Sequence, residues 1–83
     1  MITPTIHLNG SSKDSLLEEL CTALDALHAA ETALHCCSPN ARDYYPQGPE
    51  AFPGAVREHL QRVKAIRDVR AALEAILETV ADQ

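Results

Sequence analysis

Two apolar stripes with helical spacing, separated by one proline-rich segment, limit what this chain can fold into. The first repeats leucine every three or four residues, and the second continues the same spacing with Val, Leu and Ile. Between them, Ser38-Pro39 cannot continue a helix. The pattern predicts an all-α fold, an antiparallel two-helix hairpin. The stripe residues are Leu17, Leu20, Leu24, Leu27 and Leu34, then Val56, Leu60, Val63, Ile66, Val69, Leu73, Ile76, Leu77 and Val80.

The ends of the two helices follow from capping signals and prolines. Ser11 with Asp14, and Ser15 with Glu18, both have capping-box spacing, so the first helix should begin near them. Pro49 and Pro53 both suit the first turn of the second helix. We predict one domain over residues 1–83 with four segments: an extended N-terminal arm at 1–11, a helix at 12–37, a Pro/aromatic loop at 38–53 and a helix at 54–82.

Both stripes are wider than one partner helix can cover. A chain of 83 residues also builds only a small core by itself. We therefore expect hairpins to assemble into a homo-oligomeric helical bundle. The arm is expected either to fray or to lie against a neighbouring chain. Glu31 interrupts the first stripe, so its carboxylate should either tilt outward or pair with a base on the second helix.

Charge and composition exclude several functions. A formal net charge of −5 argues against binding to a DNA or RNA duplex or to an anionic membrane. No apolar run is long enough to span a membrane, and the first residues lack a signal-peptide pattern, so we expect a cytoplasmic protein. The three cysteines and four histidines lack metal-ligand spacing, and no catalytic motif is present. We expect neither enzymatic activity nor a cofactor or bound metal.

The segment 39–54 concentrates the unusual chemistry. It holds four of the five prolines, two of the three glycines and all three aromatic residues, Tyr44, Tyr45 and Phe52. The rings either seal the end of the hairpin or form a binding surface, with Asn40 and Arg42 as polar groups beside them. The pattern leaves both alternatives open.

The second helix carries five of the seven bases, Arg57, Arg62, Lys64, Arg67 and Arg70, within fourteen residues. They either match the acidic first helix, which holds five acids against one base, or belong to an anion site. Their spacing does not place them on one helix face. An oligomer could bring Arg57 or Arg62 of one chain toward Arg42 of another.

Three strings, IHLNGSS, PNARDYYPQG and AVREHLQRV, together resemble a group of short phage-encoded proteins. In size, helical-hairpin architecture and phage origin, such proteins are similar to viral sponges of the anti-CBASS and anti-Thoeris type. These sponges are oligomers that sequester nucleotide second messengers of bacterial immunity. The resemblance implies a phage anti-defence protein, acting in the cytoplasm of the infected bacterium, that binds a cyclic oligonucleotide or ADP-ribose-type signal without catalysis.

For a nucleotide ligand, each part of the molecule has a candidate partner in the chain. Rings would stack on the base, arginines and the start of the first helix would hold phosphates, and asparagines would bind hydroxyls. The alternative function is an oligomeric protein-interaction module or inhibitor that binds a host protein through the aromatic loop. The candidate residues are Asn9, Ser11, Ser12, Asn40, Arg42, Tyr44, Tyr45, Phe52, Arg57 and Arg62.

Overall fold

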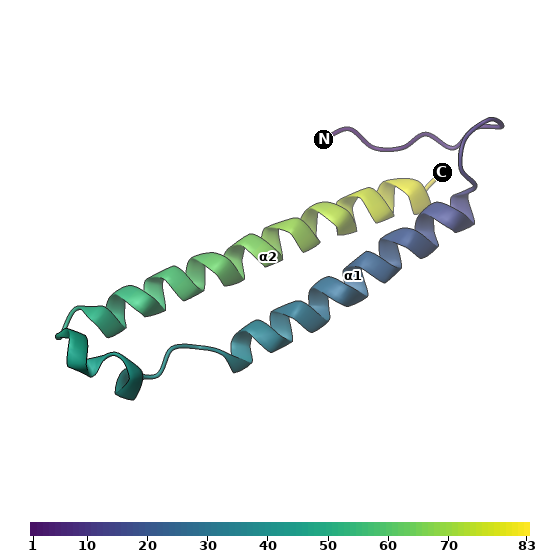
Figure 1. The fold of residues 1–83 in the computed structure, drawn as a ribbon. Helices are drawn as coiled ribbons and strands as arrows, with labels where there is room; N and C mark the ends of the chain where they lie inside the picture. The colour runs from purple at the N-terminus through teal and green to yellow at the C-terminus, as the bar shows by residue number, and fades with distance from the viewer.

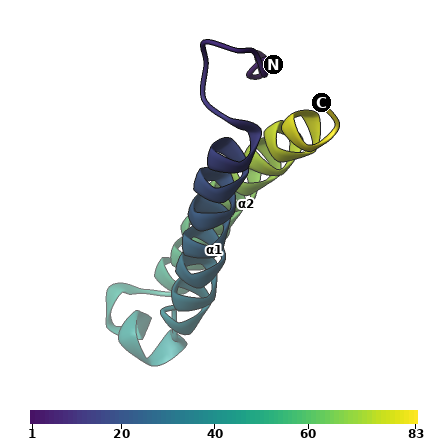
Figure 2. The same ribbon diagram turned by 90° about the vertical axis from the view of Figure 1, so that its right-hand side faces the viewer.

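Two long helices run antiparallel and side by side in the computed structural model, which describes all residues from 1 to 83 (Figure 1). Helix α1 spans Lys13–Cys36 and helix α2 spans Ala51–Ala81. Two short 3-10 turns, η1 at Ala41–Asp43 and η2 at Tyr45–Gln47, lie in the connection. A view turned by 90° shows the same pairing of the helices (Figure 2). The all-α hairpin expected from the stripes is confirmed.

Local signals explain where α1 begins and ends. Ser12 is the N-cap, and its hydroxyl accepts a hydrogen bond from the Ser15 amide at 3.1 Å. Asp14 adds a negative charge in the first turn, where the helix dipole favours it. At the other end, the Cys37 amide still donates to the Leu34 carbonyl, after which Ser38-Pro39 stops the helix.

Helix α2 begins three residues before the predicted start. Glu50 is its N-cap, and the Gly54 amide donates to the Glu50 carbonyl at 3.1 Å. Pro53 therefore lies within the first turn, where an amide would have no partner inside the helix. Its missing N–H costs no hydrogen bond there. With 31 residues against 24, α2 is the longer arm of the hairpin.

The core is a narrow seam between the helices. Only four side chains are buried, and of these only Val63 and Val80 are apolar; the other two are Glu31 and His59. Leu60 and Val69, counted above as part of the second stripe, are 59% and 51% exposed. One hairpin thus leaves much of its apolar surface open, as the width of the stripes predicts. Neither helix is long and apolar enough to cross a membrane.

The N-terminal arm folds back beside the end of α2 (Figure 1). The Gln83 side-chain amide accepts a hydrogen bond from the Ile6 N–H and donates one to the Pro4 carbonyl, each at 2.7 Å. Lys13 Nζ donates to the Gln83 carbonyl at 2.8 Å. The arm therefore contacts its own chain, an arrangement that the sequence did not indicate. Ile2 and Leu8 gain nothing from it and are almost fully exposed.

Candidate functional site

The connection between the helices is an ordered structure. The Asn40 side chain caps η1 by accepting a hydrogen bond from the Arg42 amide at 3.1 Å. Gly48, which ends η2, has φ 108°, a conformation that residues with a side chain rarely adopt. At the junction with α1, Ser38 Oγ lies 3.2 Å from Nε2 of the buried His59. The loop is thus tied to both helices, and His59 is a hydrogen-bonded residue of the seam.

The three rings of the loop have different surroundings. Tyr44 and Phe52 are half-buried and pack against each other, with centroids 6.4 Å apart and planes tilted by 41°. Tyr45 is 75% exposed. Each of the two alternatives for the loop thus describes part of it: Tyr44 and Phe52 close the end of the hairpin, and Tyr45 is open for contact.

This difference predicts opposite effects for two neighbouring substitutions. Tyr44→Ala should lower the free energy of unfolding by about 2 kcal/mol, below the ~3–5 kcal/mol of a fully buried ring. Tyr45→Ala should change it by less than about 0.5 kcal/mol, because exposed side chains make few core contacts. Urea denaturation followed by circular dichroism measures both. Equal losses in the two variants would contradict the assignment of the rings.

The arginines divide into paired and unpaired groups. Arg67 and Arg70 bind Glu31, and Arg62 lies 3.9 Å from Glu58 on the solvent side of α2. Arg42 and Arg57 have no ion-pair partner. Both belong to the loop end of the hairpin, Arg42 in η1 and Arg57 in the second turn of α2, where its Nη2 lies beside Gly54. The unpaired guanidinium groups therefore occur at the same end as the aromatic rings.

The other candidate residues lie elsewhere. Asn9, Ser11 and Ser12 precede α1, at the opposite end of a molecule 62 Å long, and all three are exposed. One chain therefore brings Asn40, Arg42, Tyr44, Tyr45, Phe52 and Arg57 to one end and leaves the N-terminal residues far from them. The loop itself holds no enclosed cavity. The one hollow in the surface is an open site on α1 lined by Ser15, Glu18, Glu19 and Thr22, whose carboxylates would repel an anion.

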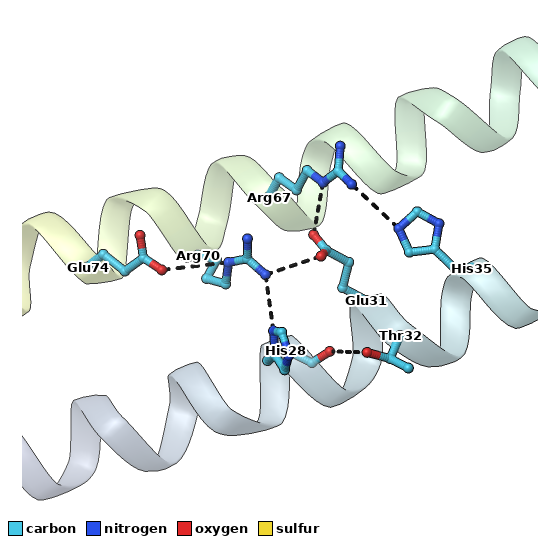
Figure 3. A network of polar contacts seen from close by, with 7 residues as sticks. All are labelled: His28, Glu31, Thr32, His35, Arg67, Arg70 and Glu74. Atoms are coloured by element: carbon cyan, nitrogen blue, oxygen red, sulfur yellow. Dashed lines mark hydrogen bonds and ion pairs between the residues drawn. The ribbon is translucent and has the colours of Figure 1, made fainter.

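A network of charges crosses the seam near its middle (Figure 3). Glu31 of α1 is only 9% exposed and accepts from Arg67 Nε and Arg70 Nη1 of α2, each at 3.1 Å. Nη1 of Arg70 also lies 3.4 Å from His28 Nδ1, and Nη2 of Arg67 lies 3.5 Å from His35 Nε2. Glu31 thus pairs with bases on the second helix and does not tilt outward.

The sequence pattern did not single out Arg67 and Arg70 as the partners of Glu31, or His28 and His35 as the neighbours of these two arginines. A usable signal was present: the spacing of three and four residues that runs through Val63 and Ile66 continues to Arg70 before Leu73. Arg70 is therefore at a seam position, as Glu31 is on α1. Two opposite charges at seam positions of paired helices indicate a cross-helix ion pair.

The network shifts the ionisation of Glu31. Partial burial by itself would raise the pKa of the carboxyl, but the hydrogen bond from Arg67 and the charges of Arg70 and Arg67 outweigh it, so the pKa lies below its ordinary value of 4.5. A carboxyl with a lowered pKa stabilises the folded state above its unfolded pKa. That stabilisation is lost as the pH falls through the folded value.

We therefore expect the hairpin to lose stability below about pH 4.5, and part of that loss should belong to Glu31. Melting temperatures measured from pH 6 to pH 3 should fall less steeply for Glu31→Gln than for the wild type, although Glu31→Gln starts lower at pH 6. Asp25→Asn is the matched control, since Asp25 is exposed on the same helix and has no ion-pair partner. An identical slope in Glu31→Gln and the wild type would contradict the assignment.

The three thiols form neither a disulfide nor part of a metal-binding cluster. Cys21, Cys36 and Cys37 are free and exposed, and no three His, Cys, Asp or Glu side chains are close enough together to hold a metal ion. The cysteines also make few packing contacts that a serine would lose. Serine should therefore replace Cys36 and Cys37 together with little change in helical content or melting temperature, as measured by circular dichroism. Stoichiometric zinc in the purified wild-type protein would contradict this.

Comparisons with protein-family models, with curated proteins and with solved structures found no match to this chain.

Proposed function

We propose that the protein is a non-catalytic, self-associating binding protein whose loop end holds an anionic ligand with a flat ring, a nucleotide being the ligand class that fits. One observation carries the proposal. The only two guanidinium groups without a carboxylate partner, Arg42 and Arg57, lie at the end of the hairpin that also carries every aromatic ring.

The chemistry of these groups matches the two halves of a nucleotide. The exposed ring of Tyr45 offers a face for stacking, which contributes about 1–3 kcal/mol per base. An arginine whose charge is not already neutralised forms charge-assisted hydrogen bonds with phosphate, each contributing about 1.5–3 kcal/mol. Arg67 and Arg70 are engaged with Glu31, so they are poor candidates for this role.

Tight binding needs more groups than one chain offers. Nanomolar affinity corresponds to about −12 kcal/mol, so one stacked ring and two arginines do not reach it after the cost of ordering the ligand. The absence of a cavity at the loop indicates the same requirement. A site shared between two chains would enclose the ligand and double the number of contacts.

For the biological role, we propose sequestration of a nucleotide immune signal, a cyclic oligonucleotide or an ADP-ribose-type molecule, by a phage protein in the infected bacterium. Support comes from the resemblance of the IHLNGSS, PNARDYYPQG and AVREHLQRV strings to short phage-encoded proteins. A protein that binds without turnover works by stoichiometry. Sequestration therefore needs only groups that bind the ligand, and this chain offers aromatic rings and unpaired arginines.

Thermal shift with a panel of immune nucleotides tests the proposal. A ligand present at 100 times its dissociation constant should stabilise the fold by about 2.7 kcal/mol. Arg42→Ala and Tyr45→Ala should abolish the shift with little loss of stability, because both side chains are exposed. Lys64→Ala is the charge-matched control: Lys64 is exposed and paired with Asp68 in the middle of α2.

The second candidate is a protein-interaction module, favoured by the exposure of Tyr45. Tyrosine is enriched at binding hot spots, since it buries a large area at a small cost in side-chain entropy. The same experiment separates the candidates. If no nucleotide at millimolar concentration shifts the melting temperature of the wild type, the nucleotide proposal fails and a protein partner becomes the remaining candidate.

A further inference from the structure

The hairpin has two unlike faces on either side of its seam. One face carries His28 and His35 of α1 together with Arg67 and Glu74 of α2, as Figure 3 shows; we call it the histidine face. Helical spacing places a second set of residues on the other flank of the seam. In an antiparallel pair, matching flanks of the two helices lie on the same side. This apolar face consists of Leu16, Ala23, Ala30, Val69 and Ile76.

The middle of the apolar face has no charge. Further alanines, including Ala26 and Ala72, border this face on the side away from the seam. Charged side chains come in only toward its ends, with Arg62 and Glu58 near the loop and Glu19 near the start of α1. Ala30 and Val69 are both exposed in the single chain, Val69 by 51%. Small side chains would allow another helix pair to approach closely and bury Val69 and Ile76.

The amount of exposed surface supports a missing partner. The chain exposes 6021 Å², whereas a compact folded monomer of 9.0 kDa exposes about 4,900 Å². Its radius of gyration is 18.5 Å, against about 12 Å for a compact domain of this length. The excess of about 1,100 Å² is close to the ~800 Å² that each partner buries in a standard stable interface.

We infer that a second copy of this chain covers the apolar face, with the two hairpins antiparallel in a four-helix bundle. This deepens the self-association in the proposed function by specifying its surface. The end charges decide the orientation. In the antiparallel arrangement, the Arg62 end of each apolar face lies beside the Glu19 end of its partner, while a parallel arrangement would gather the two Arg62 side chains at one end and the two Glu19 side chains at the other.

The antiparallel arrangement has a consequence for the ligand site. A two-fold axis through the middle of the apolar face brings the loop end of one chain to the start of α1 in the other. Arg42 and Tyr45 would then lie near Ser11 and Ser12 of the second copy, residues that one chain holds at opposite ends of its 62 Å length. The start of α1 presents amide groups that favour phosphate. Each dimer would contain two such composite sites.

Light scattering on matched variants tests the surface. Val69→Glu should reduce the mass from a dimer of about 18 kDa to the 9.0 kDa of one chain, because a buried, unpaired charge should weaken association by more than about 100-fold. Leu60→Glu is the matched control: Leu60 is similarly exposed on α2 but belongs to the flank with the histidine face. It should leave the dimer intact. Ala30→Glu, an exchange between good helix formers, should repeat the result from α1, and circular dichroism must show that each variant keeps its helices.

Disulfide trapping tests the orientation. In a background with all three native cysteines changed to serine, Ala23→Cys with Ala30→Cys should yield a covalent dimer on oxidation, because the antiparallel arrangement packs α1 on α1 of the partner. The two positions are about 10 Å apart along one helix, too far for an internal bridge. Neither single cysteine variant should cross-link. A dimer in which the double variant forms no covalent link would overturn the antiparallel orientation.

The remaining outcomes separate this inference from the function. A wild-type mass of one chain at 100 micromolar would overturn both the apolar interface and the proposed self-association. A wild-type oligomer that Leu60→Glu dissociates and Val69→Glu does not would overturn the apolar face alone. If the dimer meets all these tests but no nucleotide raises its melting temperature, the proposed nucleotide ligand is refuted and the apolar interface is retained.

Discussion

Val63→Asp should unfold the hairpin at 25 °C. Val63 is 3% exposed and is one of only two buried apolar side chains, so an aspartate there would have almost no access to water. Arg67, one turn later on α2, is already engaged with Glu31. An unpaired charge in such a site costs about 3–5 kcal/mol. The whole stability of a chain of this length is about 4–12 kcal/mol, and a seam with only two buried apolar side chains places this hairpin at the low end of that range. Circular dichroism at 222 nm should therefore show most of the helical signal lost.

Gln61→Asp is the control for this change, because Gln61 is exposed and lies two residues earlier on the same helix. It introduces the same charge and similar helix propensity without entering the seam, so helicity should stay within a few per cent of the wild type. A Val63→Asp protein as helical as Gln61→Asp would show that the seam contributes little to holding the two helices together.

The second large effect concerns the melting temperature at the centre of the seam: single variants should lower it, and the double variant should restore or raise it. Arg70→Leu removes one of the two guanidinium groups that neutralise Glu31, and Glu31→Leu leaves Arg70 in the seam with only the exposed carboxylate of Glu74 as a partner. Each single variant should melt below the wild type. The double variant Glu31→Leu with Arg70→Leu should melt at or above the wild type, since replacing both members of a buried pair with apolar residues is often neutral or stabilising.

Melting temperatures of all four proteins, measured at pH 7, complete the cycle. Arg67 is more exposed than Arg70, so water can solvate it when Glu31 is gone. Its unpaired charge should therefore not lower the melting temperature of the double variant. A double variant that melts well below the wild type would mean that the ion pair stabilises the seam more than two leucines do.

Much of the fold is predictable from the sequence because helical spacing is a strong local signal. The leucines from Leu17 to Leu34 and the stop at Ser38-Pro39 define α1 almost to the residue. The start of α2 was less predictable, since Pro49 and Pro53 both suit a first turn. Which proline lies in the first turn depends on where the preceding turn ends, and η2 ends at Gly48, which has a positive φ. Such backbone angles have no unique sequence pattern.

Less of the candidate site is predictable, because it depends on contacts between distant residues. Composition identified the aromatic loop, but nothing in the order Tyr44-Tyr45 indicates that the first ring packs on Phe52 and the second is exposed. The bonds from Gln83 to the backbone of the arm join residues nearly eighty positions apart. The oligomer and the ligand remain predictions, tested by the experiments above.

The two polar layers of the seam, Glu31 with Arg70 and Ser38 with His59, also fix the register of the helices. Leu and Val recur along both seams at heptad intervals, so a slide of one helix by seven residues, about 10 Å, would still match apolar with apolar. It would also oppose Glu31 to Val63 or Leu77 and separate its carboxylate from Arg70. The ordered connection of residues 37–50 begins at one of these pairs, Ser38 with His59, so the polar pairs and the loop together select a single alignment.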